Sequence, residues 1–87
     1  MTNCREYFTL IPTFEEIMEL KNSLKKHRFN KGQITQDSLA KKLQVSRQTV
    51  NAIENGKFNP SVKLALQIAD FFRCKVEDIF YLEENNK

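Results

Sequence analysis

The sequence predicts a single all-α domain of five short helices with a short N-terminal extension. The chain has 87 residues, enough for one small hydrophobic core and too few for a deep catalytic cleft. Apolar residues recur at helical spacing, and Ser or Thr precedes several of these stretches, as expected of helix caps. The apolar and charged fractions, 40% and 29%, are those of an ordinary globular domain and argue against disorder.

The first predicted helix begins at Thr13 and ends near Gly32. Thr13 and Glu16 have the spacing of a capping box, in which both side chains accept hydrogen bonds from backbone amides. Gly32 suits the left-handed residue that often follows a helix. The apolar residues expected on the inward face are Phe14, Ile17, Leu20 and Leu24. The basic residues expected on the solvent face are Lys21, Lys25, Lys26 and Arg28.

The segment before this helix, residues 1–12, is apolar but lacks helical spacing. Its larger apolar side chains are Tyr7, Phe8, Leu10 and Ile11. Such side chains favour packing over disorder. The segment could add a strand, lengthen a dimer interface or be disordered. Our hypothesis is that it pairs with Phe80-Tyr81-Leu82, within one subunit or across two.

Two short helices joined by a tight turn come next. Thr35 and Ser46 are their expected N-caps, and Gln44-Val45 forms the turn between them. Because Ala40 is small, the two helices can cross closely. The second of the pair ends at Asn55-Gly56. The residues expected to face the core are Leu39, Ala40, Leu43, Val50 and Ile53.

Two further helices close the domain. A turn at Asn59-Pro60 leads to Ser61, the expected cap of the fourth helix. Its apolar stripe is interpreted as core and consists of Leu64, Ala65, Ile68, Ala69 and Phe72. A short last helix is predicted over residues 76–80, followed by Tyr81-Leu82 and a polar tail.

Basic charge is concentrated around the central helix pair. The formal net charge of the chain is +3, which by itself implies no nucleic-acid partner. From Lys21 to Lys63, however, ten Lys and Arg residues stand against Asp37 and Glu54, a net charge of +8. The segments before and after carry −3 and −2. Such a local excess is typical of a phosphate-binding surface, and the alternative is a charged surface that only maintains solubility.

The sequence offers little for catalysis or metal binding. His27 is the single histidine, and Cys4 and Cys74 lie too far apart for metal-ligand spacing. No Gly-rich phosphate loop and no paired carboxylates in an apolar setting occur. We therefore expect no enzyme activity, cofactor or metal. Without a signal peptide or transmembrane run, we expect a cytoplasmic protein with no membrane partner, a buried Cys74, a loose Cys4 and no disulfide.

Polar residues on the outward face of the third helix have the chemistry of base recognition. Arg47 can donate two hydrogen bonds to guanine O6 and N7, or bind a phosphate. Gln48 can pair with adenine, and Asn51 offers a third amide or a water-bridged contact. Thr49 can touch a thymine methyl group or a phosphate. The alternative is that these residues only solvate an exposed helix, as the same residue types often do. The turn and the flanking core pattern favour recognition over that alternative.

Several segments resemble the helix-turn-helix of the Xre/Cro/CI-like family of bacterial and phage regulators. The resemblance covers about residues 22–82. The segments that carry it are Ile34-Thr35-Gln36, Leu39-Ala40, Val45-Ser46-Arg47-Gln48-Thr49-Val50, Ile53-Glu54-Asn55-Gly56-Lys57, Asn59-Pro60-Ser61 and Val76-Glu77-Asp78-Ile79-Phe80. The resemblance implies a five-helix, lambda-repressor-like DNA-binding domain. It also implies a homodimeric transcriptional regulator, often a repressor, of the compact subgroup with little beyond this domain.

The resemblance assigns DNA-binding roles to individual residues. Arg47, Gln48 and Asn51 occupy base-reading positions. Gln36 matches the family glutamine that holds a phosphate and braces the recognition helix. Asn55 and Lys57, on either side of Gly56, match a phosphate clamp. The residues expected to contact phosphates or position the protein are Gln36, Ser46, Thr49, Asn55 and Lys57, while Ser46 and Glu54 are also expected to stabilise helix ends.

Three residues depart from the family pattern. Gln44 and Arg73 stand where glycine is usual, in the motif turn and after the fourth helix. A left-handed non-glycine residue costs about 1–2 kcal/mol, so these changes are expected to lower stability more than function. His27 stands where leucine is usual, and we expect a partly buried, neutral imidazole at the edge of the core.

Together these observations predict a transcriptional regulator that binds double-stranded DNA as a homodimer. Helix 46–54 is expected in the major groove of a pseudo-palindromic site whose half-sites lie about 34 Å apart. The expected organisation is an extension with the start of the first helix at 1–20, the DNA-binding domain at 21–82 and a polar tail at 83–87. The alternative is an antitoxin or protein-interaction module of the same fold, with a toxin or another protein as partner.

Overall fold

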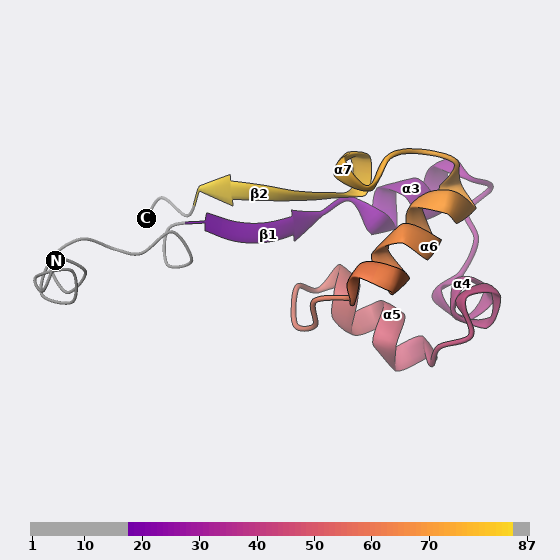
Figure 1. Ribbon diagram of the computed structural model, residues 1–87. Coiled ribbons are helices and arrows are strands. Elements are labelled where there is room, and N and C mark those ends of the chain that lie inside the picture. Colours follow the sequence, from indigo (N-terminus) through magenta and orange to yellow (C-terminus); the bar gives the residue numbers. More distant parts are fainter. Residues whose placement is uncertain (1–17, 85–87) are drawn as a thin grey trace, which may run out of the picture.

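The computed structural model describes residues 18–84. In chain order its elements are β1 (Met18–Asn22), α3 (Leu24–Asn30), α4 (Gln36–Leu43), α5 (Arg47–Glu54), α6 (Val62–Phe72), α7 (Val76–Ile79) and β2 (Phe80–Glu84). The helices form a bundle, and β1 and β2 project from it as a two-stranded ribbon (Figure 1). The predicted capping box at Thr13, the packing of segment 1–12 and the position of Cys4 lie outside the described residues.

One hydrophobic core lies among the helices. Its largest fully buried side chains are Leu24 of α3, Leu39 of α4, Val50 and Ile53 of α5, Ile68 of α6 and Ile79 of α7. Ala40 is 2% exposed, as predicted for a small residue between α4 and α5. The spacing of apolar residues therefore identified the inward faces of α4, α5 and α6 correctly.

The predicted fold is confirmed in part: five helices are present among residues 18–84, but the ribbon shows that the domain is not all-α. β1 and β2 pair antiparallel, with Met18 opposite Glu84, Leu20 opposite Leu82 and Asn22 opposite Phe80. The predicted first helix is accordingly replaced by a strand over residues 18–22, and the helix begins only at Leu24. Met, Glu, Leu and Lys are good helix formers, but pairing with a distant strand overrides local propensity. The domain is mostly helical with a small sheet.

The second strand also takes over the end of the last predicted helix. α7 stops at Ile79, and Phe80 begins β2 while remaining buried. Residues 80–82 pair with β1, which lies in the N-terminal part of the chain. The predicted partner, segment 1–12, lies outside the described residues.

The N-caps predicted for three helices are confirmed. The hydroxyl groups of Thr35, Ser46 and Ser61 accept hydrogen bonds from the backbone amides three residues later, at 3.0, 3.1 and 3.1 Å. Each bond satisfies one of the amide groups that a helix start leaves without a partner. These local bonds set where α4, α5 and α6 begin.

The three residues that depart from the family pattern lie where the sequence predicts them. Gln44 and Arg73 are left-handed, with φ of 61° and 56°, and they terminate α4 and α6. His27 is half-buried, and its ring stands edge-on to Phe72 with 5.6 Å between centroids. Its Nδ1 lies 2.9 Å from the Ser23 carbonyl oxygen, so the imidazole sits at the edge of the core.

Arg28 lies inside the molecule, which corrects its predicted place on the solvent face of the first helix. The residue is 6% exposed and follows the buried Leu24 by one helical turn, so both share the inward face. A buried guanidinium is tolerable only with an ionic partner. That partner is Glu54 of α5, at 2.6 Å.

Candidate nucleic-acid interface

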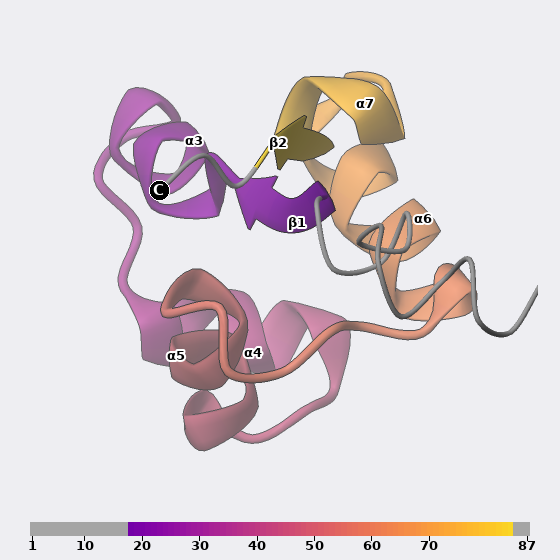
Figure 2. The same ribbon diagram turned by 90° about the vertical axis from the view of Figure 1, so that its left-hand side faces the viewer.

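Helices α4 and α5 form a tightly connected pair. The amide of Val45 donates to the carbonyl oxygen of Ala40 at 3.0 Å, and the left-handed Gln44 turns the chain between the helices. α5 then buries Val50 and Ile53 against α4 and the rest of the core. Its opposite side is left on the surface of the molecule (Figure 2).

The start of α5 carries the three predicted base-reading residues on that surface. Arg47, Gln48 and Asn51 are all exposed. Within residues 18–84, no side-chain hydrogen bond or ion pair engages Arg47 or Gln48. Both therefore keep their full donor capacity for a ligand. Asn51, one turn later, differs because its side chain is already bonded within the protein.

Ser46 and Thr49 are joined to each other at the helix start. Ser46 Oγ accepts from the Thr49 amide at 3.1 Å, and the two hydroxyl oxygens lie 2.9 Å apart. This agrees with the structural role expected of Ser46. Thr49 is half-buried and keeps part of its surface toward solvent.

The turn after α5 uses its backbone amides internally. The amides of Asn55, Gly56 and Lys57 donate to carbonyl oxygens of α5 at 3.0, 3.0 and 2.9 Å. Gly56 has φ of +75°, a conformation that favours glycine. The exposed side chains of Asn55 and Lys57 are therefore the parts of this turn that remain open to a ligand.

A buried polar network lies directly beneath the outward face of α5. The Arg28 Nε and Nη2 donate to the two carboxylate oxygens of Glu54 at 2.6 and 3.1 Å, and Nη1 donates to the Ile34 carbonyl oxygen at 2.7 Å. The two side chains are 7% and 4% exposed. Gln36, the first residue of α4, then donates through Nε2 to Glu54 at 3.0 Å and to Asn51 at 3.1 Å.

Sequence reasoning missed the centre of this network. Gln36 was expected to brace the recognition helix, and it does contact Asn51, but Glu54 was interpreted only as a helix-end residue. The available signal was the four-residue spacing of Leu24 and Arg28, which places a cation on the inward face of its helix. A buried cation implies a buried acid; Asp37 and Glu54 are the two acids between Lys21 and Lys63.

Comparison with known proteins identifies this arrangement. Residues 24–79, which include all five described helices, match a family model described as Helix-turn-helix. The chain belongs to the helix-turn-helix family. Its expected membership is thus confirmed.

Relatives with similar sequences extend over most of the same region. An uncharacterized HTH-type transcriptional regulator of Methanocaldococcus jannaschii is 56% identical over 66 residues, covering 76% of this chain and 98% of the relative. The uncharacterized HTH-type transcriptional regulator YgzD of Bacillus subtilis is 46% identical over 67 residues, covering 77% and 100%. A further uncharacterized HTH-type transcriptional regulator, from Archaeoglobus fulgidus, is 51% identical over 51 residues, covering 59% and 72%.

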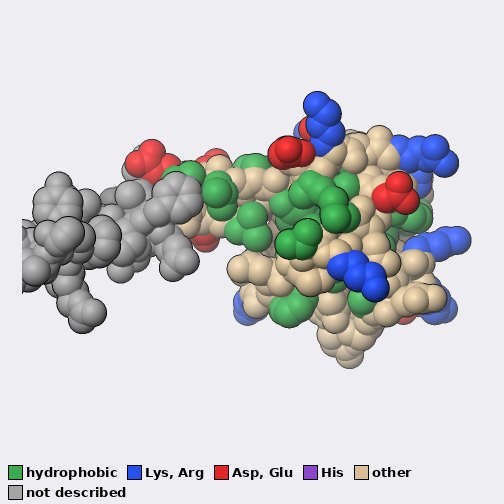
Figure 3. All heavy atoms as spheres, viewed as in Figure 1, with side chains coloured by type: hydrophobic (Ala, Val, Ile, Leu, Met, Phe, Trp, Pro, Cys, Tyr) green, Lys and Arg blue, Asp and Glu red, His purple; other side chains and the backbone are tan. Residues whose placement is uncertain are grey.

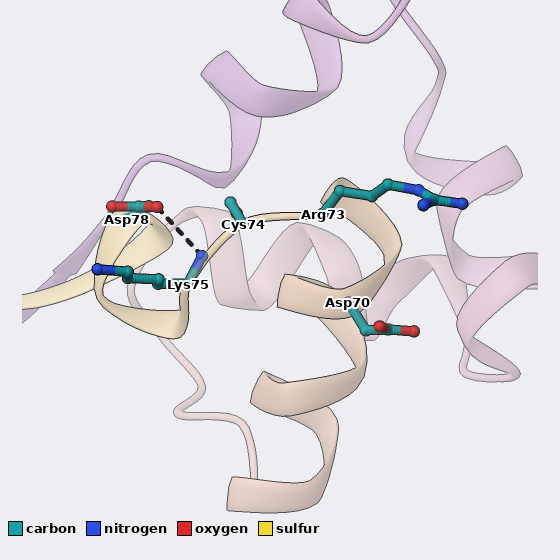
Figure 4. A pocket seen from close by; sticks show the side chains of 5 residues that line it. All are labelled: Asp70, Arg73, Cys74, Lys75 and Asp78. Carbon is teal, nitrogen blue, oxygen red and sulfur yellow. Dashed lines mark hydrogen bonds between the residues drawn. The ribbon is translucent and has the colours of Figure 1, made fainter.

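A polar hollow lies away from α5, between the end of α6 and the start of α7. It is lined by Asp70, Arg73, Cys74, Lys75 and Asp78 (Figure 4). Burial raises the pKa of the Cys74 thiol, and the charge of Asp78 raises it further. A thiol with a raised pKa is protonated at neutral pH and is a poor nucleophile. Within the hollow, the Lys75 amide donates to the Asp78 carboxylate at 3.1 Å, a bond that caps the start of α7.

The described part of the chain offers neither a metal site nor a membrane-spanning helix. Among residues 18–84, no three His, Cys, Asp or Glu side chains are grouped so that they could hold a metal ion. Within the same range, no helix has the length and apolar character needed to cross a membrane.

Proposed function

We propose that this chain is a sequence-specific regulator of transcription that binds double-stranded DNA with α5 in the major groove. The observation that carries the proposal is the outward face of α5, where Arg47 and Gln48 lie exposed in the first turn of a well-packed helix and have no side-chain partner among residues 18–84. The membership of the helix-turn-helix family and the names of the relatives support it. We further propose repression, by occupation of a site that overlaps a promoter.

Base reading is assigned to three residues. Arg47 reads guanine through a bidentate pair of hydrogen bonds, and Gln48 reads adenine. Asn51 makes the third contact, from the next turn of the helix. Each good bidentate contact contributes roughly 1–3 kcal/mol of discrimination between bases.

Phosphate binding is assigned to residues at both ends of the helix pair. Lys57 and Asn55 contribute their exposed side chains after α5. At the start of α4, both Nε2 hydrogens of Gln36 have partners within the protein, so we assign its phosphate contact to the backbone amide of the first helical turn. Ser46 and Thr49 position the start of α5 against the DNA backbone.

The remaining positive charge supports phosphate binding. Since the buried Arg28–Glu54 pair is neutral as a unit, removing it from the charge count leaves the segment from Lys21 to Lys63 at +8. Nine basic residues then stand against Asp37 alone. Binding by such a segment should weaken steeply with salt, because the cations displace counterions from DNA.

We propose a homodimer, with the interface on the apolar face formed by α6 and the ribbon. A groove on this face is lined by Leu20, Pro60, Val62, Ala65, Leu66, Val76 and Phe80. Val62 and Leu66 are 77% and 56% exposed, and hydrophobic side chains gather over this region (Figure 3). Contiguous exposed apolar surface is typical of an association site. A second copy covering it leaves the outward face of α5 available in both subunits.

The first test is selection of bound duplexes from a randomised DNA pool at near-physiological salt. We expect the wild type to enrich an inverted repeat. Arg47→Ala should lose preference at one base pair of each half-site, with affinity for the wild-type site falling roughly 5- to 150-fold for each half-site. The matched control is Arg73→Ala. Arg73 is an exposed arginine at the C-terminal end of α6, and its substitution should keep the wild-type preference.

Lys57→Ala separates phosphate contacts from base contacts in the same assay. It should weaken binding to all sequences equally and reduce the slope of log affinity against log salt by about 1 for each subunit. Equal loss of specific and non-specific binding in both Arg47→Ala and Lys57→Ala would overturn the division of roles. DNA retention without any enriched sequence would overturn sequence-specific recognition.

The dimer is tested by sedimentation equilibrium of Leu66→Glu and Gln67→Glu. Both substitutions add one negative charge to exposed neighbouring positions of α6, but only Leu66 lines the groove. We expect Leu66→Glu to be monomeric and Gln67→Glu to remain dimeric. A wild-type chain that is monomeric at micromolar concentration would overturn the homodimer and favour a different protein as the occupant of the groove.

A further inference from the structure

We infer that the buried Arg28–Glu54 pair, acting through Gln36, holds the Asn51 amide so that it presents hydrogen-bond donors to DNA. Asn51 therefore reads bases that offer acceptors and rejects cytosine on the strand it contacts. The inference rests on the proposed function and adds the positioning residues behind one base contact. It also specifies that Asn51 recognises base edges that accept hydrogen bonds.

The chain of orientation begins at Glu54. Both of its carboxylate oxygens accept hydrogen bonds from Arg28, and Nη1 of the same guanidinium is fixed by the Ile34 carbonyl oxygen. A bidentate pair between nearly buried groups leaves the carboxylate little freedom to rotate. An ionised carboxylate has only acceptor atoms. Any neutral group placed against Glu54 must therefore supply a hydrogen.

Gln36 is the group placed against it. Its terminal amide has a nitrogen that donates and an oxygen that accepts, and a half-turn of the amide group exchanges the two. The contact of 3.0 Å with Glu54 Oε1 removes this ambiguity, since a carbonyl oxygen there would face another acceptor. Nε2 must occupy this position. Its second hydrogen is then directed to the side chain of Asn51, 3.1 Å away.

The same reasoning fixes Asn51. Because a donor approaches it from Gln36, the Asn51 atom at the contact must be the carbonyl oxygen Oδ1. The nitrogen Nδ2, with two hydrogens, is then the atom without a protein partner among the described residues. Asn51 is exposed on the outward face of α5, so these hydrogens are available to a base.

Base edges in the major groove differ in what they offer to such a donor. Guanine presents N7 and O6, thymine presents O4 and adenine presents N7, all of which accept hydrogen bonds. Cytosine presents only its N4 amino group, which donates. An amide whose oxygen is turned toward Gln36 can satisfy the first three bases and opposes the fourth.

The orientation can be measured without DNA, by NMR of the side-chain amides in the full chain. We expect the Gln36 Nε2 hydrogens to exchange with water more slowly than those of the exposed Gln48, by about an order of magnitude or more. Asn51→Ala should shift the Gln36 resonances and leave those of Gln67 unchanged. Exchange of Gln36 as fast as that of Gln48, with no response to Asn51→Ala, would overturn the network.

Base preference is then tested by selection from the randomised pool with wild type, Asn51→Asp and Gln36→Met. In Asn51→Asp, one oxygen still accepts from Gln36 and the other replaces the donor, so one position should change from excluding cytosine to enriching it. Gln36→Met keeps the length of the side chain but removes both hydrogen bonds. It should relax the exclusion of cytosine at that position and leave the position read by Arg47 unchanged.

Asn55→Asp is the matched control for the added negative charge. It should reduce affinity for all sequences without altering any base preference, because Asn55 has no contact with Gln36. Enrichment of cytosine by the wild type at the position that responds to Asn51→Asp would overturn the inference. An unchanged preference in a folded Gln36→Met variant would do the same. If the wild type enriched no sequence, the proposed function would fail, while the NMR measurement would still decide the orientation of Asn51.

Discussion

The helix pair α4–α5 and the ribbon β1–β2 are held in place by different kinds of interaction. Each helix of the pair starts at its own hydroxyl cap, and a nearly buried ion pair anchors the second helix to α3. The ribbon depends on pairing between chain ends, and both of its strands are largely half-buried or exposed. The difference indicates a firmly built helix pair attached to a less stable ribbon, and the following variants test it.

The largest effect is expected from Glu54→Gln. The substitution keeps the shape of the side chain but leaves the Arg28 charge buried without an ionic partner. Removing one member of a buried pair lowers the free energy of unfolding by about 3–5 kcal/mol. Urea denaturation at low temperature measures the loss.

A double variant distinguishes the charge effect from a packing effect. Arg28→Met combined with Glu54→Leu replaces both charges with apolar groups, and it should recover most of the stability lost in Glu54→Gln. A Glu54→Gln protein within about 0.5 kcal/mol of the wild type would mean that solvent already reaches the pair. The helix pair would then be no more firmly anchored than the ribbon.

The helices were predictable because their signals are local. Thr35, Ser46 and Ser61 cap helices within three residues of themselves, and inward residues recur every three or four positions. The positions of Arg47 and Gln48 on the outward face follow from the same periodicity. The proposed base-reading surface could therefore be placed from the sequence before any tertiary contact was known.

The ribbon could not be predicted, and the pairing of Arg28 with Glu54 could not be assigned, because both depend on residues that are distant in the sequence. β1 consists of good helix formers, and its strand conformation follows from pairing with β2, which local spacing does not show. Arg28 and Glu54 are 26 residues apart, and only the folded arrangement brings them together. Tertiary context overrode the default assumption that an arginine faces water.

The next largest effect is expected from Asn22→Ala, at the junction of ribbon and helices. Asn22 Nδ2 donates to the Ile53 carbonyl oxygen at 2.9 Å, and its Oδ1 accepts from the Leu24 amide at 3.1 Å. Losing both bonds should lower the free energy of unfolding by about 2 kcal/mol. Urea denaturation measures it, with the exposed loop residue Asn59→Ala as a control expected to stay within about 0.5 kcal/mol.

Hydrogen exchange of the same Asn22→Ala variant tests the comparison directly. Amides of β1 and β2 should exchange faster than in the wild type, while those in the centre of α5 should change less. Equal acceleration in the ribbon and in α5 would show that the two regions unfold as one unit, and the proposed difference in stability would be wrong.

A smaller effect of opposite sign is expected from Gln44→Gly in the turn between α4 and α5. Gln44 has φ of 61°, and relief of left-handed strain contributes about 1–2 kcal/mol. The greater entropy of glycine in the unfolded chain offsets about 0.5–1 kcal/mol of it. A net stabilisation of about 0.5–1 kcal/mol should raise the thermal midpoint, whereas the control Gln67→Gly, within α6, should lower it. A lower midpoint for both would show that Gln44 is unstrained.

The smallest effects should differ in sign between the two regions. Asp37 lies 3.5 Å from Lys41 in the first turn of α4, where the helix dipole also favours a negative charge. Asp37→Asn should therefore destabilise the protein by about 0.5 kcal/mol. Glu19 lies 3.6 Å from Lys21 but stands directly opposite Glu83 across the ribbon.

Like charges in opposed cross-strand positions are destabilising, by up to several tenths of a kcal/mol. Glu19→Gln should consequently leave stability unchanged or raise it by a few tenths, because the relieved repulsion offsets the lost surface ion pair. Thermal unfolding at low salt and at about 1 M NaCl checks both variants, since salt should bring each toward the wild type. Suppose instead that Glu19→Gln destabilised the protein as much as Asp37→Asn. Surface charges would then stabilise the ribbon as much as they stabilise the helix pair. The lower stability of the ribbon would have to come from its hydrogen bonds and packing alone.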